Sequence, residues 1–198
     1  MNCEHCGKTF TGANFRKHMQ RKTPCKRVPP SSSVVKPFLK WAGGKTQIID
    51  SVLARFPSEI ANYYEPFLGG GSVLLALLSR VRAGDIKLSG RVYASDINVN
   101  LIRVYTCIQK DVDAVITALH GLKRQMDACG QGAVNRDARD LQEAMTSAEA
   151  YYYWIRRCYN ESPSKDLSNT DLAAMFIYLN KTCFRGLYRE GPNGFNVP

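Results

Sequence analysis

Tyr64-Glu65-Pro66-Phe67-Leu68-Gly69-Gly70-Gly71-Ser72 largely determines how this chain folds. The residues from Ala61 to Phe67 predict a short strand, and the three glycines predict a tight turn that opens an apolar helix from Ser72 to about Val81. A second strand is predicted from Arg91 to Ile97, with Asp96 at its end. Strand, glycine turn, helix and a later carboxylate are together typical of a nucleotide-type cofactor site in an α/β fold with a parallel sheet.

The glycine spacing favours S-adenosylmethionine over a dinucleotide. A dinucleotide places its pyrophosphate on a G-x-G-x-x-G turn, and Gly69-Gly70-Gly71-Ser72 does not have that spacing. S-adenosylmethionine carries no phosphate and needs only a tight turn beside its methionine and ribose. Gly69, Gly70 and Gly71 are therefore expected to supply geometry and backbone contacts. Asp96 is expected to bind the ribose hydroxyls, although a strand-end Asp also commonly caps the next helix.

Further blocks accompany this stretch in a fixed order along the chain. They are Lys40-Trp41-Ala42-Gly43-Gly44-Lys45, Glu65 to Ser72, Asp96-Ile97-Asn98, Leu179 to Arg189, and Phe195 to Pro198. With these blocks, the segment from Lys36 to Pro198 resembles the Dam-type, D12 class DNA adenine-N6 methyltransferases. The resemblance implies a Rossmann-like S-adenosylmethionine-dependent methyltransferase domain with an inserted helical DNA-recognition subdomain. It also implies methyl transfer to adenine N6 in double-stranded DNA.

One family block is missing from the printed sequence. The family's catalytic Asp-Pro-Pro-Tyr loop follows Phe-Asn-Val-Pro, but here Pro198 is the last residue, and the single Pro-Pro pair, Pro29-Pro30, follows Val28. We therefore expect an incomplete domain. A shortened gene, an expressed fragment, or a split enzyme whose second chain restores the loop would each explain it.

Three further cofactor contacts are expected, and the resemblance implies the one made by Trp41. Lys45 is expected to face the cofactor's carboxylate. The sequence around it superficially resembles a phosphate-binding loop, but Leu39 stands where that motif needs glycine. Trp41 is expected to lie against the cofactor, although a lone tryptophan before a glycine turn usually belongs to the core. Glu65 is expected to reach the methionine amine, and a strand-end salt bridge is the alternative.

The resemblance also implies DNA contacts near the last residue. Phe184 would be an aromatic wedge in the base stack, while Leu187, Arg189 and Pro198 would face bases or backbone. Arg185 stands where the family usually has Asn, and we expect it to contact a phosphate. The structural alternative is a surface hairpin that turns at Gly191-Pro192-Asn193-Gly194, which is compatible with DNA contact.

Four potential zinc ligands lie near the first residue. Cys3, Cys6, His18 and Cys25 have a zinc-finger spacing with Cys as the fourth ligand. Chance clustering is the alternative. The sequence leaves open whether such a finger binds DNA or protein.

The net charge of +10 lies mainly at the two ends of the chain. Residues 1–40 hold nine Lys and Arg against one acidic residue, residues 41–180 are neutral, and residues 181–198 carry a net charge of +2. This distribution fits phosphate neutralisation in DNA binding, and a merely solubilising tail is the alternative. A DNA-binding protein with a zinc finger and no catalytic activity is thus the second hypothesis for function.

The rest of the sequence suggests a soluble, intracellular protein. No apolar run is long enough for a membrane span, and Cys107, Cys129, Cys158 and Cys183 are expected to be buried thiols. The expected division is a finger at 1–27, a Pro/Ser-rich linker at 28–35, a cofactor part at 36–98 and a recognition region at 99–198. Helices are expected at 46–55, 99–109, 112–122, 136–159 and 170–184, and Ser168-x-x-Asp171 resembles a capping box at the start of the last one. The Tyr151 to Trp154 run is expected to lie in the core rather than to form a stacking platform.

Overall fold

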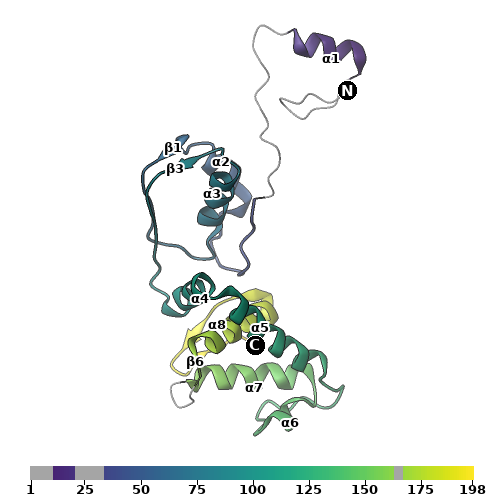
Figure 1. Cartoon of the computed structure of the whole chain (residues 1–198). Coiled ribbons are helices and arrows are strands. Elements are labelled where there is room, and N and C mark those ends of the chain that lie inside the picture. Colours follow the sequence, from purple (N-terminus) through teal and green to yellow (C-terminus); the bar gives the residue numbers. More distant parts are fainter. Residues whose placement is uncertain (1–10, 21–33, 163–166) are drawn as a thin grey trace. The chain divides into compact units, whose positions relative to one another are not determined.

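The computed structural model describes residues 11–20, 34–162 and 167–198. The chain divides into two compact units (Figure 1). Unit 1 contains Met1–Lys36, Lys45–Tyr64 and Ser72–Val92, and unit 2 contains Pro37–Gly44, Glu65–Gly71 and Tyr93–Pro198. Within unit 1, helix α1 (Gly12–Met19) carries three basic residues in its last turn: Arg16, Lys17 and His18.

The remainder of unit 1 is a small α/β assembly. The 3₁₀ turn η1 (Thr46–Ile48) leads into α2 (Ile49–Leu53), and α3 (Ser72–Arg82) follows β1 (Glu59–Ile60) along the chain. Strand β1 pairs in parallel with β3 (Lys87–Leu88). Leu53, Ala76, Leu77 and Ile86 form the buried cluster of this unit. The predicted helix from Ser72 is confirmed, while the segment predicted as one helix at 46–55 is a 3₁₀ turn followed by a short α-helix.

The two predicted strands are present but short. They are β2 (Tyr63–Glu65) and β4 (Val92–Ala94), which pair with each other. The Tyr63 N–H donates to the Arg91 carbonyl and the Ser95 N–H donates to the Glu65 carbonyl, both at 2.9 Å. The bonded residues advance in the same direction on both strands, as in a parallel pair. In the described ranges every sheet has two strands, so these residues show the predicted α/β character without a wide Rossmann-like sheet.

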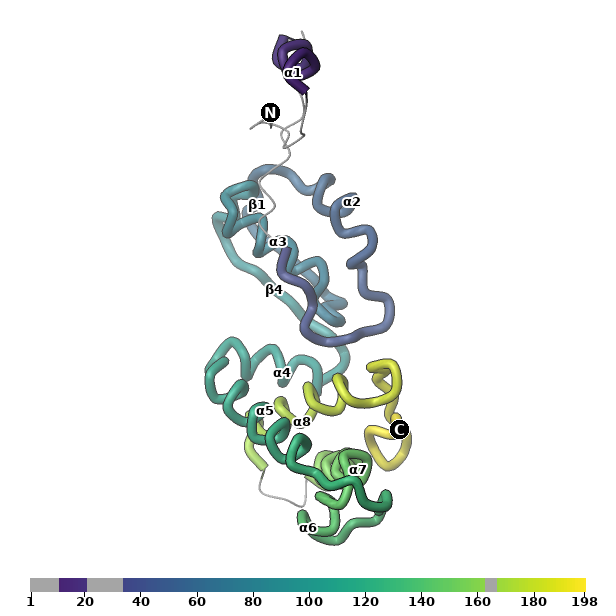
Figure 2. The backbone as a smooth tube through the Cα atoms, turned by 90° about the vertical axis from the view of Figure 1, so that its right-hand side faces the viewer, coloured from purple at the N-terminus to yellow at the C-terminus, as the bar shows by residue number. Residues whose placement is uncertain are grey.

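Unit 2 is mainly helical and is organised around one central helix. Helix α8 (Asn169–Thr182) packs against α4 (Val99–Lys110), α5 (Val112–Asp127) and α7 (Ala148–Asn160) (Figures 1 and 2). Every residue of α8 from Leu172 to Asn180 is buried, which is expected of a helix that neighbours surround. The Ser168–Asp171 capping box that the sequence predicted at its start is confirmed.

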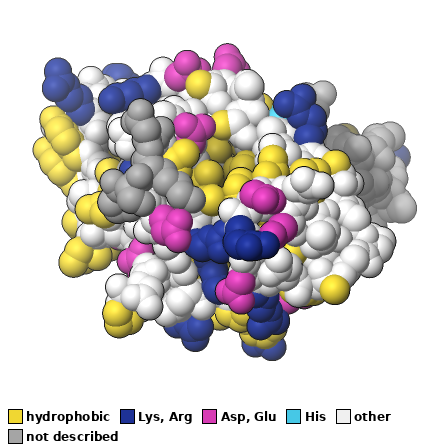
Figure 3. All heavy atoms as spheres, turned by 90° about the horizontal axis from the view of Figure 1, so that it is seen from below, with side chains coloured by type: hydrophobic (Ala, Val, Ile, Leu, Met, Phe, Trp, Pro, Cys, Tyr) yellow, Lys and Arg dark blue, Asp and Glu magenta, His cyan; other side chains and the backbone are white. Residues whose placement is uncertain are grey.

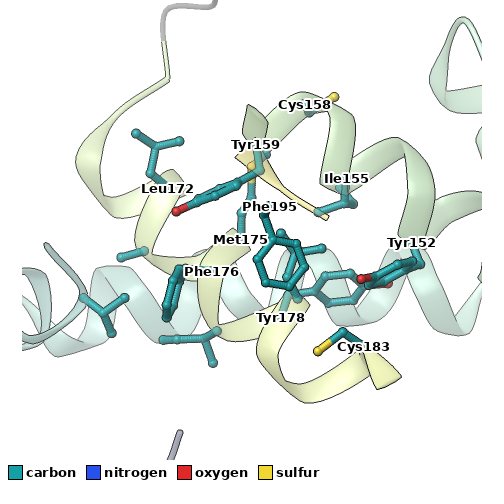
Figure 4. Close-up of a cluster of buried hydrophobic side chains, with 14 of the residues drawn as sticks. Tyr152, Ile155, Cys158, Tyr159, Leu172, Met175, Phe176, Tyr178, Cys183 and Phe195 are labelled. Atoms are coloured by element: carbon teal, nitrogen blue, oxygen red, sulfur yellow. The ribbon is translucent and has the colours of Figure 1, made fainter. Parts of the chain in front are cut away.

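The core of unit 2 is rich in aromatic side chains. The Tyr159 ring of α7 packs against the Phe176 ring of α8, with centroids 6.3 Å apart, and Tyr152 and Ile155 of α7 belong to the same buried cluster (Figure 4). Tyr151 is fully buried, so the expectation that the Tyr151 to Trp154 run belongs to the core is confirmed. The four cysteines that were expected to be buried are all free thiols. Three of them are buried, namely Cys107, Cys158 and Cys183, and Cys129 is half-buried.

The helix predicted at 136–159 was wrong. The structure has instead a four-residue helix, α6 (Leu141–Ala144), followed by α7. Asp140 accepts a hydrogen bond from the Glu143 N–H and Ser147 accepts one from the Ala150 N–H. Each of these side chains starts a new helix, and Ser147 lies in extended backbone between the two. Local side-chain capping therefore divides the predicted helix.

Surface charges of both signs alternate around α6 and α7. Figure 3 shows Lys and Arg side chains beside Asp and Glu side chains on this face. Arg136 pairs with Glu149 at 3.0 Å, and Arg139 pairs with Glu143 at 2.7 Å. Exposed pairs of this kind contribute little to stability, because water screens them. Among the helices of the described segments, none is both long and apolar enough to cross a membrane.

Candidate cofactor and DNA-contact site

The glycine turn of unit 2 is held by the strand that follows it in the sequence. The Leu68 N–H donates to the Ser95 carbonyl at 2.9 Å, and the Gly71 N–H donates back to the Leu68 carbonyl at 2.9 Å. The Gly69 N–H donates to Asp96 Oδ2 at 2.8 Å. The turn and the predicted ribose-binding carboxylate are therefore in direct contact.

Asp96 also organises the start of the next helix. Its Oδ1 accepts from the Asn98 N–H at 3.0 Å, and Asn98 in turn caps α4 through a bond from the Leu101 N–H at 2.9 Å. Asn98 rather than Asp96 is thus the cap of α4, and Asp96 holds the backbone of that cap residue. A carboxylate has about four lone-pair sites, so these two bonds fix its orientation and leave acceptor capacity for a ligand hydroxyl.

The three glycines pack closely against aromatic side chains, so a larger residue at any of them would force a neighbour to shift. A Cβ at Gly69 would lie 3.1 Å from Trp41 Cδ1, and one at Gly70 would lie 3.0 Å from Trp41 Cβ. A Cβ at Gly71 would lie 2.6 Å from the Tyr105 hydroxyl, and Gly71 has a φ of +70°. The sequence predicted that these glycines serve geometry. The structure supplies the reason, which is close packing against two rings.

Tyr105 is a site residue that the sequence did not reveal. Its hydroxyl is buried and has no hydrogen-bond partner among the described residues. Burial, with a contribution from the nearby Glu65 carboxylate, raises the pKa of Tyr105 well above its usual value. Nothing in the local sequence connects Tyr105 to Gly71, which lies 34 residues earlier in the chain.

Trp41 combines a core position with contact to the glycine turn. Its ring stacks on Tyr188, with centroids 5.1 Å apart and an interplanar angle of 28°. The Phe176 ring lies on the core side of Trp41, with the centroids of these two rings 6.3 Å apart. Trp41 is half-buried, so it forms a wall beneath Gly69 and Gly70 while keeping part of its surface accessible.

The other two predicted cofactor residues occupy different positions. Glu65 ends β2 in unit 2, and its side chain is half-buried. Lys45 belongs to unit 1, where its N–H donates to Ser72 Oγ at 3.0 Å. Unit 2 therefore gathers six of the seven predicted cofactor residues: Trp41, Glu65, Gly69, Gly70, Gly71 and Asp96.

The predicted DNA-contact residues lie on a strained turn after α8. The turn η3 (Phe184–Gly186) leaves the Phe184 side chain 58% exposed, and Leu187 is 47% exposed. Arg185 has a φ of 58°, a left-handed conformation that costs a non-glycine residue about 1–2 kcal/mol. Its guanidinium lies over the Phe184 ring, 5.1 Å from the centroid. A cation and an aromatic ring are thus presented together on one exposed turn.

Pro198 and Arg189 are tied to the same region. The Phe184 N–H donates to the Pro198 carbonyl at 2.7 Å. Arg189 donates through Nε to Asn196 Oδ1 at 2.6 Å and through Nη2 to the Asn196 carbonyl at 3.1 Å. These bonds orient the Arg189 side chain along the hairpin.

The hairpin predicted around residues 191–194 is confirmed. Strand β5 (Glu190–Gly191) pairs antiparallel with β6 (Gly194–Phe195). Asn160 of α7 anchors it, because its Oδ1 accepts from the Phe195 N–H and its Nδ2 donates to the Phe195 carbonyl, both at 2.9 Å. No local pattern in the sequence predicts this role for Asn160.

The predicted zinc site is represented by one residue. His18 lies in α1 and is 6% exposed, while Cys3, Cys6 and Cys25 are outside the described residues. Within 11–20, 34–162 and 167–198 no three His, Cys, Asp or Glu side chains group as a metal site would.

Comparison with known proteins gives a consistent result. Residues 41–198 match the D12 class N6 adenine-specific DNA methyltransferase family. Type II methyltransferase M.MjaIII of Methanocaldococcus jannaschii is 39% identical over 170 residues, which is 83% of this chain and 52% of that protein. The DNA adenine methylases of Escherichia coli K12 and Haemophilus influenzae are 31% and 30% identical, over 81% and 82% of this chain and 46% of each relative. The chain thus spans about half the length of these relatives.

Proposed function

Since the chain belongs to the D12 class N6 adenine-specific DNA methyltransferase family, we propose that it forms the cofactor-binding and DNA-contacting part of such an enzyme. The reaction is methyl transfer from S-adenosylmethionine to adenine N6 in double-stranded DNA. The observation that carries this proposal is the glycine turn, which Asp96 fixes and Trp41 supports, in the same unit as the exposed Phe184 turn.

The residues present fit the cofactor. The glycine turn offers a cradle that side chains at these positions would fill, and the carboxylate beside it retains acceptor capacity. Asp96 would accept from the ribose hydroxyls and Trp41 would flank the ligand. Glu65 would bind the amine of the methionine part, and a contact between Lys45 and its carboxylate stays a prediction. When bound, S-adenosylmethionine supplies an electrophilic methyl group.

The exposed turn of unit 2 would contact the DNA. Phe184 is an apolar ring on the surface and would insert into the base stack at the extruded adenine. Arg185 would contact a phosphate, and Arg189 would face base edges or backbone from its fixed orientation on the hairpin. Leu187 and Pro198 would complete the apolar contact.

The groups that position the adenine amine would come from outside these 198 residues. The printed sequence holds no Asp-Pro-Pro-Tyr, whose acceptors would bind the N6 hydrogens and direct the nitrogen lone pair. We propose that a further segment or a second chain provides this loop. Methyl transfer is then mainly a matter of positioning and electrostatics.

Calorimetry with S-adenosylmethionine tests the cofactor part. The full chain is expected to bind, and Asp96→Ala is expected to weaken binding about tenfold or more, as a lost hydrogen bond to a charged group does. Asp111→Ala is the matched control, because Asp111 accepts from the Ala114 N–H at the start of α5. If both variants bind as the unaltered chain does, the proposed site is wrong.

A zinc-finger DNA-binding protein without catalytic activity is the second candidate. The positive charge of residues 1–40 and the basic last turn of α1 favour it. We propose that Cys3, Cys6, His18 and Cys25 bind one structural Zn²⁺. Elemental analysis should find one zinc per chain, and His18→Ala should abolish it. DNA affinity that depends on zinc, together with no heat from S-adenosylmethionine, would favour this candidate over the first.

A further inference from the structure

We propose that Asn180 is a positioning residue that couples cofactor binding at Trp41 to DNA contact by Phe184 and Arg185. The inference rests on the proposed function, because it concerns the two binding regions assigned above. Asn180 lies in the middle of the central helix α8 and is 2% exposed. A buried amide is costly unless its hydrogen-bonding groups are satisfied, so its partners show what it does there.

The Asn180 side chain binds the backbone of two separate segments. Its Oδ1 accepts from the Lys40 N–H at 2.8 Å, and its Nδ2 donates to the Lys40 carbonyl at 2.8 Å. The same Nδ2 donates to the Gly186 carbonyl at 3.3 Å. The Lys40 N–H can be satisfied only by the amide oxygen, which fixes the orientation of the amide. One side chain therefore joins the segment before Trp41 to the turn that carries Phe184.

Two packing contacts strengthen the same junction. The Lys40 side chain lies so close to Gly186 that a Cβ at that position would overlap it. Close by in both segments, the Trp41 ring, one residue after Lys40, stacks on Tyr188, two residues after Gly186. Trp41 also supports Gly69 and Gly70 from below. A continuous set of contacts therefore runs from the glycine turn through residues 40–41 to residues 184–188, all within unit 2.

The exposed turn depends on these contacts for its shape. Arg185 is left-handed, and a strained residue keeps such a conformation only where its surroundings fix it. Gly186, the next residue, is held by Asn180 through its carbonyl and by Cys183 through its N–H, at 3.1 Å. DNA contact at Phe184 and Arg185 would stabilise this arrangement of the turn and, through Asn180, the arrangement of Lys40 and Trp41. Two ligands that favour the same arrangement bind with positive coupling.

The test measures that coupling in the full chain. Calorimetry gives the affinity for S-adenosylhomocysteine with and without a saturating DNA duplex. DNA is expected to tighten binding by a factor of about 5–150, the usual range for coupled sites. Asn180→Leu, which keeps the side-chain size, should bring the factor close to one. Asn180→Asp should do the same, because its carboxylate would face two carbonyl oxygens. Tyr151→Phe is the control, since it removes a buried hydroxyl bound to Gln125 elsewhere in this core and should leave the factor unchanged.

A purely structural role for Asn180 predicts a different result. Its variants would then lower thermal stability and weaken both ligands, but the coupling factor would stay as in the unaltered chain, and the inference would be wrong. Should both Asn180 variants fail to fold, Tyr188→Leu breaks the stack on Trp41 and is expected to lower the factor by the same route. An unchanged factor in that variant, or a factor of one in the unaltered chain, would equally contradict the inference.

A second readout separates this inference from the proposed function. The sequence has two tryptophans, Trp41 and Trp154, so the variant Trp154→Phe retains only Trp41 as a fluorescent tryptophan. Duplex DNA alone should then change the emission of Trp41, and Asn180→Asp should remove that change. If S-adenosylhomocysteine does not bind at all, the proposed function fails, and the emission still reports whether the junction transmits DNA contact. An emission that DNA leaves unchanged would overturn the inference by itself.

Discussion

Gly71→Ala is a substitution whose cost can be worked from the structure. The new methyl group would lie 2.6 Å from the Tyr105 hydroxyl, and the backbone φ is +70°. The left-handed conformation costs a non-glycine residue about 1–2 kcal/mol, and overlap in a packed region adds about 1–3 kcal/mol. We expect the free energy of unfolding to fall by roughly 2–5 kcal/mol, the sum of these ranges.

Two further variants separate the two contributions. Gly84 also has a positive φ, +78°, but a Cβ there meets nothing within 4 Å, so Gly84→Ala should cost only the backbone part. Tyr105→Phe removes the overlapping hydroxyl, which has no partner among the described residues, and should be neutral or stabilising by about 1 kcal/mol. The double variant Gly71→Ala/Tyr105→Phe should then be more stable than Gly71→Ala, because the overlap is mostly removed. It should remain less stable than the unaltered chain by the backbone contribution.

Urea unfolding monitored by circular dichroism gives these free energies. The double-variant cycle should show a favourable interaction of about 1–3 kcal/mol between the two substitutions. Gly71→Ala with unchanged stability would refute the close approach. A loss of more than about 1 kcal/mol in Tyr105→Phe would show that the hydroxyl has a partner after all.

Three other substitutions or conditions test separate parts of the structure. Phe184→Ala should weaken duplex binding at least tenfold without lowering thermal stability, because this ring is 58% exposed; an equal loss of stability would show that it is a packing residue. Ser168→Ala removes the capping box of α8 and should cost about 1 kcal/mol in urea unfolding, whereas a cost near zero would make the cap irrelevant. Burial raises the pKa of Tyr151 and Tyr152 in the folded state. The unfolded state therefore loses these protons first, and the free energy of unfolding should decrease as the pH rises above about 10. A stability that is flat through that range would contradict the burial of these hydroxyls.

The sequence predicted the elements whose causes are local. The apolar run after Ser72 and the capping box before α8 each produced a helix where it was expected. The helix expected at 136–159 was wrong because Asp140 and Ser147 cap two separate helices there, and periodicity does not register such bonds. The two-residue strands β1 and β3 were missed because they are too short to show a pattern.

In the candidate site, too, the residues with a local sequence pattern were predicted and those that depend on long-range contacts were not. The glycine turn and Asp96 were predicted from the strand-turn-helix pattern, and the structure joins them by a hydrogen bond. Tyr105 and Asn180 were not predicted as site residues. Their partners lie 34 or more residues away, at Gly71 and Lys40, so that only the folded chain brings them together. A local sequence pattern therefore could not predict these two site residues.

Amide chemical shifts would test the proposed cofactor site most directly. In a ¹⁵N-labelled full chain, S-adenosylmethionine should shift the amide signals of Gly69, Gly70 and Gly71 and the indole N–H signal of Trp41. The amide of Gly121, within α5, should stay in place. Shifts confined to other parts of the chain, or none at saturating ligand, would contradict the assignment of this turn as the binding site.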